Sequence, residues 1–197
     1  KMNLNGLKNI GKIHLYKDSG VYPDPYDDNF NWCIYSPFDE DGYSKVVPEK
    51  GKINIAVYHG AVWGSHTDTD WMLDGDTKMD LFRPFEFTML GDIHKTNQIL
   101  DMEGRVRYAG STVQQNFGET NDKGYLLWNI KGKDDFTCKH MAFSNPKPFV
   151  TLSMVYPLLS SKLTNGELAA RPNTVSVVVV AGSVTDSPSE SERHQRC

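Results

Sequence analysis

An aspartate and a histidine follow an apolar run in the middle of the sequence, and their spacing suits metal chemistry. The run ends at Leu90, Gly91 comes next, and Asp92 and His94 follow two positions apart. In an extended chain, side chains at positions i and i+2 project to the same face, and Gly91 permits a tight turn. The sequence therefore predicts that Asp92 and His94 point into one site at the end of a strand.

A second histidine, His59, ends another apolar run, at 53–58, and precedes Gly60. Two apolar strands that each deliver a histidine at their C-terminal end indicate one shared site. His59, Asp92 and His94 form a mixed nitrogen and oxygen ligand set, which suits a divalent ion such as Mn, Fe or Zn. For either histidine alone the ordinary interpretation is a hydrogen-bonded structural residue, so the metal hypothesis depends on the two strand ends together.

Small and amide residues between 108 and 119 form a second candidate region. Ser111, Gln114 and Gln115 carry hydroxyl and amide groups that can contact a phosphate backbone or another part of a substrate. The competing interpretation is a well-made loop whose amides satisfy buried main-chain groups. Spacing alone leaves the two interpretations open.

Composition excludes several classes of protein. The chain has 197 residues, 39% of them apolar, and a net charge of -4, so it can form a core but has no overall basic footprint for nucleic acid. Its three cysteines are few and unclustered, which favours a reducing compartment, the cytoplasm or a viral replication site, over secretion. No apolar run reaches membrane-spanning length, so we expect no membrane contact.

Strands dominate the predicted secondary structure, with loops at 17–29 and 36–52 and one helical turn near 79–82. A change of character after Pro148 predicts a second unit, and the Ser-rich end at 183–197 is predicted to be disordered. The expected strands cover 10–16, 30–35, 53–58, a segment ending at Leu90, 106–108, 124–130, 136–142, 149–155 and 175–180.

These segments together resemble the calcineurin-like metallophosphoesterases, and within them the SbcD-type nucleases of DNA double-strand-break repair, especially phage-like and viral members. The matching residues are His59-Gly60, 91–95, the run from 107 to 119, and the strand 123–128, in the family's order. The resemblance implies an α/β (α+β) fold, part of a β-sandwich flanked by helices and incomplete at its N-terminus. It assigns 1–148 to the C-terminal part of the phosphoesterase domain and 149–182 to the start of a DNA-capping domain.

The resemblance also implies a reaction, phosphodiester hydrolysis in DNA by two divalent ions, usually Mn. His59 would ligate one ion and His94 the other. Asp92 stands where the family usually has a histidine, and a carboxylate is a harder but competent ligand for Mn. The implied partners of the intact protein are DNA, an SbcC-type coiled-coil ATPase and a second copy of itself.

The family's three earlier metal motifs, including the bridging carboxylate, do not occur before His59. We therefore expect that this chain alone neither holds a two-metal centre nor hydrolyses DNA, and we assign it no catalytic residue beyond the metal ligands. Two other functions stay open: a phosphoesterase acting on small phosphodiesters or phosphoproteins, and a non-catalytic scaffold with a degenerate site. The run from 110 to 119 favours the DNA branch.

Overall fold

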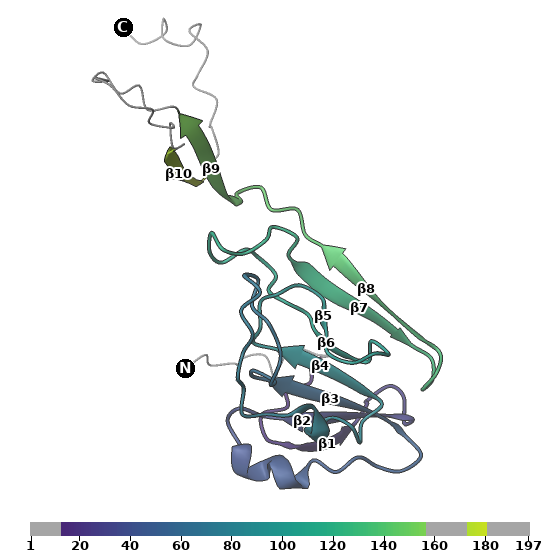
Figure 1. The fold of residues 1–197 in the computed structure, drawn as a ribbon. Helices are drawn as coiled ribbons and strands as arrows, with labels where there is room; N and C mark the ends of the chain where they lie inside the picture. Colours follow the sequence, from purple (N-terminus) through teal and green to yellow (C-terminus); the bar gives the residue numbers. More distant parts are fainter. Residues whose placement is uncertain (1–12, 157–172, 181–197) are drawn as a thin grey trace, which may run out of the picture. The chain divides into compact units, whose positions relative to one another are not determined.

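The computed structural model describes residues 13–156 and 173–180 (Figure 1). The chain divides into two compact units, which are considered separately. The first contains Lys1–Thr112 and Asp122–Phe143, and the second contains Val113–Asn121 and Ser144–Cys197. The expected tail at 183–197 lies outside the described residues.

The first unit is built on a six-stranded mixed sheet whose four inner strands run parallel and whose two edge strands run antiparallel. In spatial order the strands are β1 (Gly20–Pro23), β2 (Phe30–Tyr35), β3 (Ile53–His59), β4 (Phe87–Gly91), β6 (Val106–Tyr108) and β5 (Gln98–Ile99). Because the carboxyl ends of parallel strands meet at one edge of a sheet, residues that end β3 and β4 come together there. His59 pairs directly with Gly91 in this register.

Few helices accompany the sheet. The described residues contain two short 3₁₀ helices, η2 (Glu40–Lys45) and η3 (Met79–Leu81), and no α-helix. The expected helical turn near 79–82 corresponds to η3. The structure thus has the strand-rich, mixed-sheet character expected of the α/β (α+β) class, whereas the metallophosphoesterase sandwich stays a prediction.

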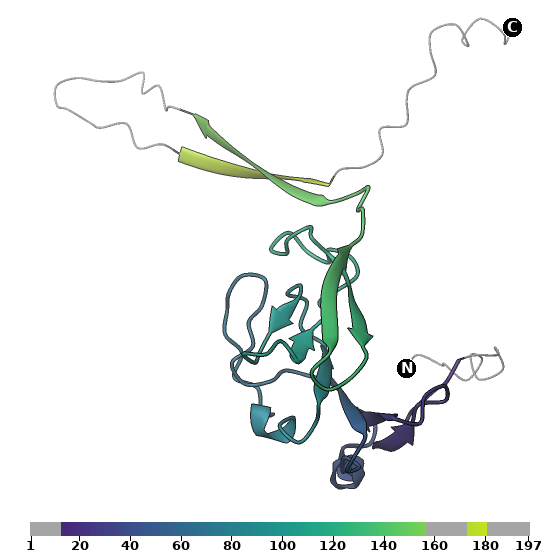
Figure 2. The same cartoon turned by 90° about the vertical axis from the view of Figure 1, so that its right-hand side faces the viewer.

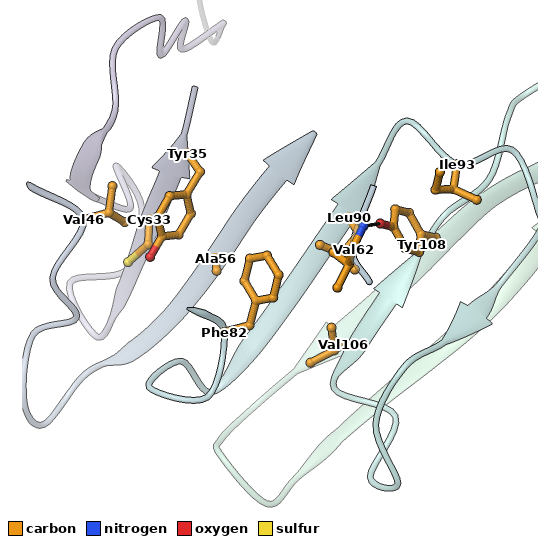
Figure 3. Close-up of a cluster of buried hydrophobic side chains, with 10 residues drawn as sticks. All are labelled: Cys33, Tyr35, Val46, Ala56, Val62, Phe82, Leu90, Ile93, Val106 and Tyr108. Carbon is orange, nitrogen blue, oxygen red and sulfur yellow. Dashed lines mark hydrogen bonds between the residues drawn. The ribbon is translucent and has the colours of Figure 1, made fainter. Parts of the chain in front are cut away.

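The main core lies on one face of the sheet, as Figure 3 shows. Side chains paired in register on neighbouring strands share a face, and Leu90 and Tyr108 are one such buried pair. Segments between the strands cover this face with Val46, Val62 and Phe82. Ile93, immediately after β4, belongs to the same cluster and anchors the end of that strand.

A β-hairpin, β7 (Gly124–Ile130) and β8 (Phe136–Ala142), covers part of the opposite face (Figures 1 and 2). The fully buried ring of Phe87 packs edge-on against Trp128 at 5.9 Å and Phe136 at 4.9 Å between centroids. The Arg105 guanidinium lies over the Phe87 and Phe136 rings and donates hydrogen bonds to Asp134 and to the carbonyl of Lys133. Arg105 therefore clamps the turn of the hairpin to the sheet.

The second unit contains an antiparallel pair, β9 (Phe149–Tyr156) and β10 (Asn173–Val180). Both strands were expected, each slightly shorter. At the start of β9, the Phe149 ring packs edge-on against Phe117, 4.8 Å between centroids. The segment 113–121 thereby belongs to this unit rather than to the first.

Four details of the secondary-structure prediction were wrong. The expected loop 36–52 contains the 3₁₀ helix η2. The described part of the expected strand 10–16, residues 13–16, is not a strand, and residues 10–12 lie outside the described residues. The expected loop 17–29 contains β1, and β5 was not predicted at all. Both missed strands are short sheet edges that pair through main-chain atoms with an inner strand, so they need no apolar alternation of their own.

Candidate metal centre

His59 stands at the carboxyl end of β3 with its side chain 63% exposed. The neighbouring residue on β4 is Gly91, and a Cβ atom there would lie 2.8 Å from His59 Nδ1. Real Cβ atoms do not approach a nitrogen so closely. The missing side chain of Gly91 therefore leaves room for the His59 imidazole over β4.

Asp92 turns the chain out of the sheet directly after Gly91. Its φ of 90° is a conformation that L residues rarely adopt and that aspartate tolerates better than most. The side chain is 47% exposed, and Oδ1 lies 3.7 Å from His59 Nε2. The expected extended conformation over 92–94 is wrong, since the strand ends at Gly91 and Ile93 is buried in the core.

The donor atoms of His59 and Asp92 fit a shared divalent ion. Bonds from a transition metal are about 2.0–2.1 Å long to imidazole nitrogen and about 2.0–2.2 Å long to carboxylate oxygen, so two such donors of one ion lie at most about 4.3 Å apart. The 3.7 Å between Nε2 and Oδ1 is inside that limit. Both groups face solvent and can exchange protons or water for an ion without unfolding the chain.

His94 is placed differently. Its side chain is half-buried, and its carbonyl oxygen accepts hydrogen bonds from Lys123 Nζ at 2.8 Å and from the Ser111 N–H at 3.4 Å. Within the described ranges, no three His, Cys, Asp or Glu side chains converge as a ligand group. The structure thus brings His59 and Asp92 together and does not join His94 to them as a third ligand.

The run that begins at Tyr108 contacts the main chain that follows β3 and β4. The Tyr108 hydroxyl donates to the Gly60 carbonyl at 2.8 Å and accepts from the Val62 N–H at 2.9 Å, and burial raises the pKa of this phenol. Gly110 has φ 86°, and a Cβ there would lie 2.9 Å from Thr96 Cα and 3.0 Å from the carbonyl oxygen of His94. The Tyr108 hydroxyl therefore ties β6 to the main chain after β3, at Gly60 and Val62. The missing side chain of Gly110 lets the chain after β6 pack closely against the segment after β4.

Ser111 and the two glutamines of the second candidate region separate in the structure. Ser111 is buried in the first unit, between the His94 carbonyl and the Gly124 N–H that its own carbonyl accepts. Gln114 and Gln115 belong to the second unit.

Gln114 has the structural role that was the competing interpretation. Its side chain is buried, donates from Nε2 to the carbonyl of Glu119 at 2.8 Å, and accepts at Oε1 from the N–H of Phe149 at 2.9 Å. The side chain of Gln115 is exposed, and its N–H donates to Glu119. Gln114 therefore braces a turn against the start of β9.

Sequence reasoning missed a buried ion pair next to the candidate site. Lys123 Nζ lies 2.7 Å from Asp68 Oδ2, and the two side chains are 2% and 6% exposed. Both residues lie in polar segments and are separated by 55 positions, so no local pattern distinguishes them from surface charges. Only the folded chain reveals that they meet.

An open cavity of about 550 Å³ borders His59. It lies on the sheet face that the β7–β8 hairpin covers elsewhere, because Ile34 and Val57 are paired in register and both line it. The exposed ring of Phe38 stands at its rim. The apolar surface of the sheet thus continues beyond the hairpin up to the candidate ligands.

No family model matches the chain. Over 89 residues, 44% of the chain, it is 32% identical to "Uncharacterized protein R555" of Acanthamoeba polyphaga mimivirus, and this stretch spans only 6% of that protein's length. Among the residues that the structure describes, no helix combines the length and apolar character needed to cross a membrane.

Proposed function

We propose that this chain supplies part of the two-metal centre of a calcineurin-like, SbcD-type nuclease that hydrolyses phosphodiester bonds in DNA. His59, Asp92 and His94 are the proposed ligands for divalent ions, and Mn is the proposed metal. The observation that carries the proposal is the meeting of His59 Nε2 and Asp92 Oδ1, 3.7 Å apart, at the carboxyl edge of a parallel sheet.

The location supports this function. In open sheets with parallel strands, ligands bind in the crevice outside the carboxyl ends of the strands. His59 and Asp92 are exposed there, whereas the main chain that carries them is held by buried contacts from Tyr108 and Gly110. A divalent ion bound at such a site lowers the pKa of bound water and stabilises charge on a phosphate. The role of the chain's own residues is to hold that ion and orient it.

An open cavity on this sheet face supports the idea that the centre is shared with another layer. Among the described residues, the hairpin covers this face around Phe87, while Ile34, Val57 and the segment 15–18 border an open cavity that reaches His59. A sheet face of this kind is stabilised by a packed second layer. A layer added here would lie next to His59 and could bring the further ligands that a two-metal centre needs. DNA, an SbcC-type ATPase and a second copy are the proposed partners of the intact protein.

Manganese binding by the chain tests the proposal. Electron paramagnetic resonance titration should show Mn²⁺ bound to the wild-type chain and at least about tenfold weaker binding in His59→Ala and Asp92→Ala. His140→Ala is the matched control, because His140 lies within β8 of the hairpin and not at the carboxyl ends of β3 and β4. Equal Mn²⁺ affinity in all four proteins would refute the ligand assignment and favour the scaffold alternative.

A nuclease assay tests the second element of the proposal. With Mn²⁺ present, the chain alone should not cleave single- or double-stranded DNA, because the remaining ligands come from the proposed second layer. Cleavage that disappears in His59→Ala would show that the chain contains a complete centre, contrary to our proposal. Hydrolysis of a small phosphodiester without cleavage of DNA would favour the other phosphoesterase.

A further inference from the structure

The ion pair between Lys123 and Asp68 is unusual for a charged pair in this unit because both side chains are almost fully buried. Moving two charges out of water costs several kcal/mol per ion, and their mutual attraction offsets this only with good geometry and further hydrogen bonds. A buried ion pair is therefore weak evidence for stability by itself. Its position in the fold indicates what else it does.

The Lys123 ammonium joins three segments that are distant in the sequence. Lys123 immediately precedes β7, Asp68 lies in the connection after β3, and the His94 carbonyl, 2.8 Å from Nζ, lies in the connection after β4. An ammonium group carries three N–H donors, and two of them are assigned to these contacts. The same carbonyl accepts the N–H of Ser111.

Two further contacts join the connection after β3 to the segment that follows His94. Lys95 forms an ion pair with Asp70, and its hydrogen bond lowers the pKa of that carboxyl. Gln98 accepts from the N–H of His66 at 2.7 Å and donates to its carbonyl at 2.9 Å. The Lys123 contact differs from both in acting on His94 itself. It is also more buried than the exposed Lys95–Asp70 pair.

We infer that Lys123 is a positioning residue for the metal loop, residues 91–95. Its ammonium fixes the His94 carbonyl, and with it the direction in which the His94 imidazole leaves the main chain. Asp68 holds the ammonium in place and compensates its charge. This inference rests on the proposed metal-binding function and extends it to a residue that touches no proposed ion.

A pair of variants separates positioning from general stability. Lys123→Met removes the ammonium that compensates the charge of the buried Asp68 carboxylate, so both stability and Mn²⁺ affinity should fall. The double variant Lys123→Met with Asp68→Leu removes both charges, and stability should largely recover, because replacing a buried pair by apolar groups is often neutral. Mn²⁺ affinity should stay about tenfold below that of the wild-type chain, since the His94 carbonyl still lacks the Lys123 donor and keeps only the longer bond from the Ser111 N–H.

Arg105→Met is the matched control. Arg105 also bridges distant segments through ion pairs, with Glu103 and Asp134, but it clamps the hairpin turn rather than the metal loop. The variant should lose stability with its Mn²⁺ affinity unchanged. All Mn²⁺ titrations are carried out at a temperature below the lowest thermal unfolding midpoint among these variants, so that every protein is folded.

Hydrogen–deuterium exchange of the metal loop provides a readout that needs no metal. Exchange in residues 91–95 should accelerate at least about tenfold in Lys123→Met and in the double variant, as expected for a local opening favoured by about 1.4 kcal/mol, and not in Arg105→Met. Recovery of both exchange and Mn²⁺ affinity in the double variant would show that the pair has only a stabilising role. If the wild-type chain binds no Mn²⁺, the proposed function fails, while unchanged exchange would overturn the positioning role independently.

Discussion

The two ends of the parallel strands use polar residues in opposite ways. At the amino edge, Asn31 and Asn54 are paired in register and almost completely buried. The Asn54 amide donates to the carbonyls of Glu49 and Lys52 and to the Glu86 carboxylate, while its oxygen accepts the Glu49 N–H. The Asn31 amide nitrogen donates to the Glu49 carboxylate and to Asn54 Oδ1, whereas Asn31 Oδ1 is buried without a hydrogen-bond partner. Most of the polar atoms at this edge are therefore paired within the fold, so the edge is a structural network.

At the carboxyl edge the relation is reversed. There the main chain is held by buried groups, such as the Tyr108 hydroxyl on Gly60, while the side chains of His59 and Asp92 reach solvent. At the amino edge the polar side chains are buried and mostly paired within the fold, whereas at the carboxyl edge they are exposed on a main chain that other residues fix. This difference makes the carboxyl edge the better candidate for function, although both edges contain acids and amides.

Asn54→Ala should produce the largest loss of stability. The substitution removes a buried hub and leaves several partners at the amino edge unsatisfied, so we expect a loss of about 3 kcal/mol in the free energy of unfolding by urea. His59→Ala, at the other end of the same strand, should change it by less than about 0.5 kcal/mol because the imidazole is mostly exposed. Similar losses in the two variants would remove the distinction between the edges.

Gly110→Ala tests whether the main chain at the carboxyl edge is as tightly held as we describe. The added Cβ would meet main-chain atoms of Thr96 and His94 at about 3 Å, and a φ of 86° is unfavourable for alanine. We expect a loss of about 2 kcal/mol, measured by urea denaturation. Gly132→Ala is the control, since a Cβ there has no neighbour within 4 Å, and it should be neutral to within about 0.5 kcal/mol.

The sequence was sufficient for the long inner strands and the hairpin. The apolar run 30–35 and the alternating runs 124–130 and 136–142 coincide with β2, β7 and β8, because these strands bury side chains with a regular period. The edge strands β1 and β5 carry no such period and are defined by pairing with their neighbours. The local pattern of apolar residues reveals which side chains are buried. It does not reveal which edge strands pair with a neighbour, because that pairing involves residues distant in the sequence.

The same limit applies to the candidate site. Two strands that end in ligand-type residues predicted that His59 and Asp92 would meet, and parallel pairing of β3 with β4 brings them within 3.7 Å. The positive φ of Asp92, next to the buried Ile93, was not visible in the sequence pattern, which predicted extended chain there. Lys123 and Asp68 could not be predicted, because a buried ion pair between polar segments exists only in three dimensions.

Asp92→Gly should raise stability while weakening the candidate site. Glycine adopts a φ of 90° without strain, so we expect a gain of about 0.5–1 kcal/mol in the free energy of unfolding. Loss of the carboxylate should lower Mn²⁺ affinity in the same protein. Asp92→Ala keeps the strain and also removes the ligand, so it should be less stable than Asp92→Gly. A loss of stability in the glycine variant would mean that the carboxylate has a structural role, like the acids of the amino edge.

Gly91→Ala should have the smallest effect on stability and a specific effect on the histidine. The new Cβ would lie 2.8 Å from His59 Nδ1, at the far end of a side chain that is mostly exposed and can rotate away. The free energy of unfolding should therefore change by less than about 0.5 kcal/mol. The His59 ring resonances in NMR spectra should shift, and Mn²⁺ affinity should fall, because the imidazole can no longer lie over β4. Unshifted ring resonances would show that the glycine is not what places His59, and the carboxyl edge would then lose its clearest sign of a site shaped around one side chain.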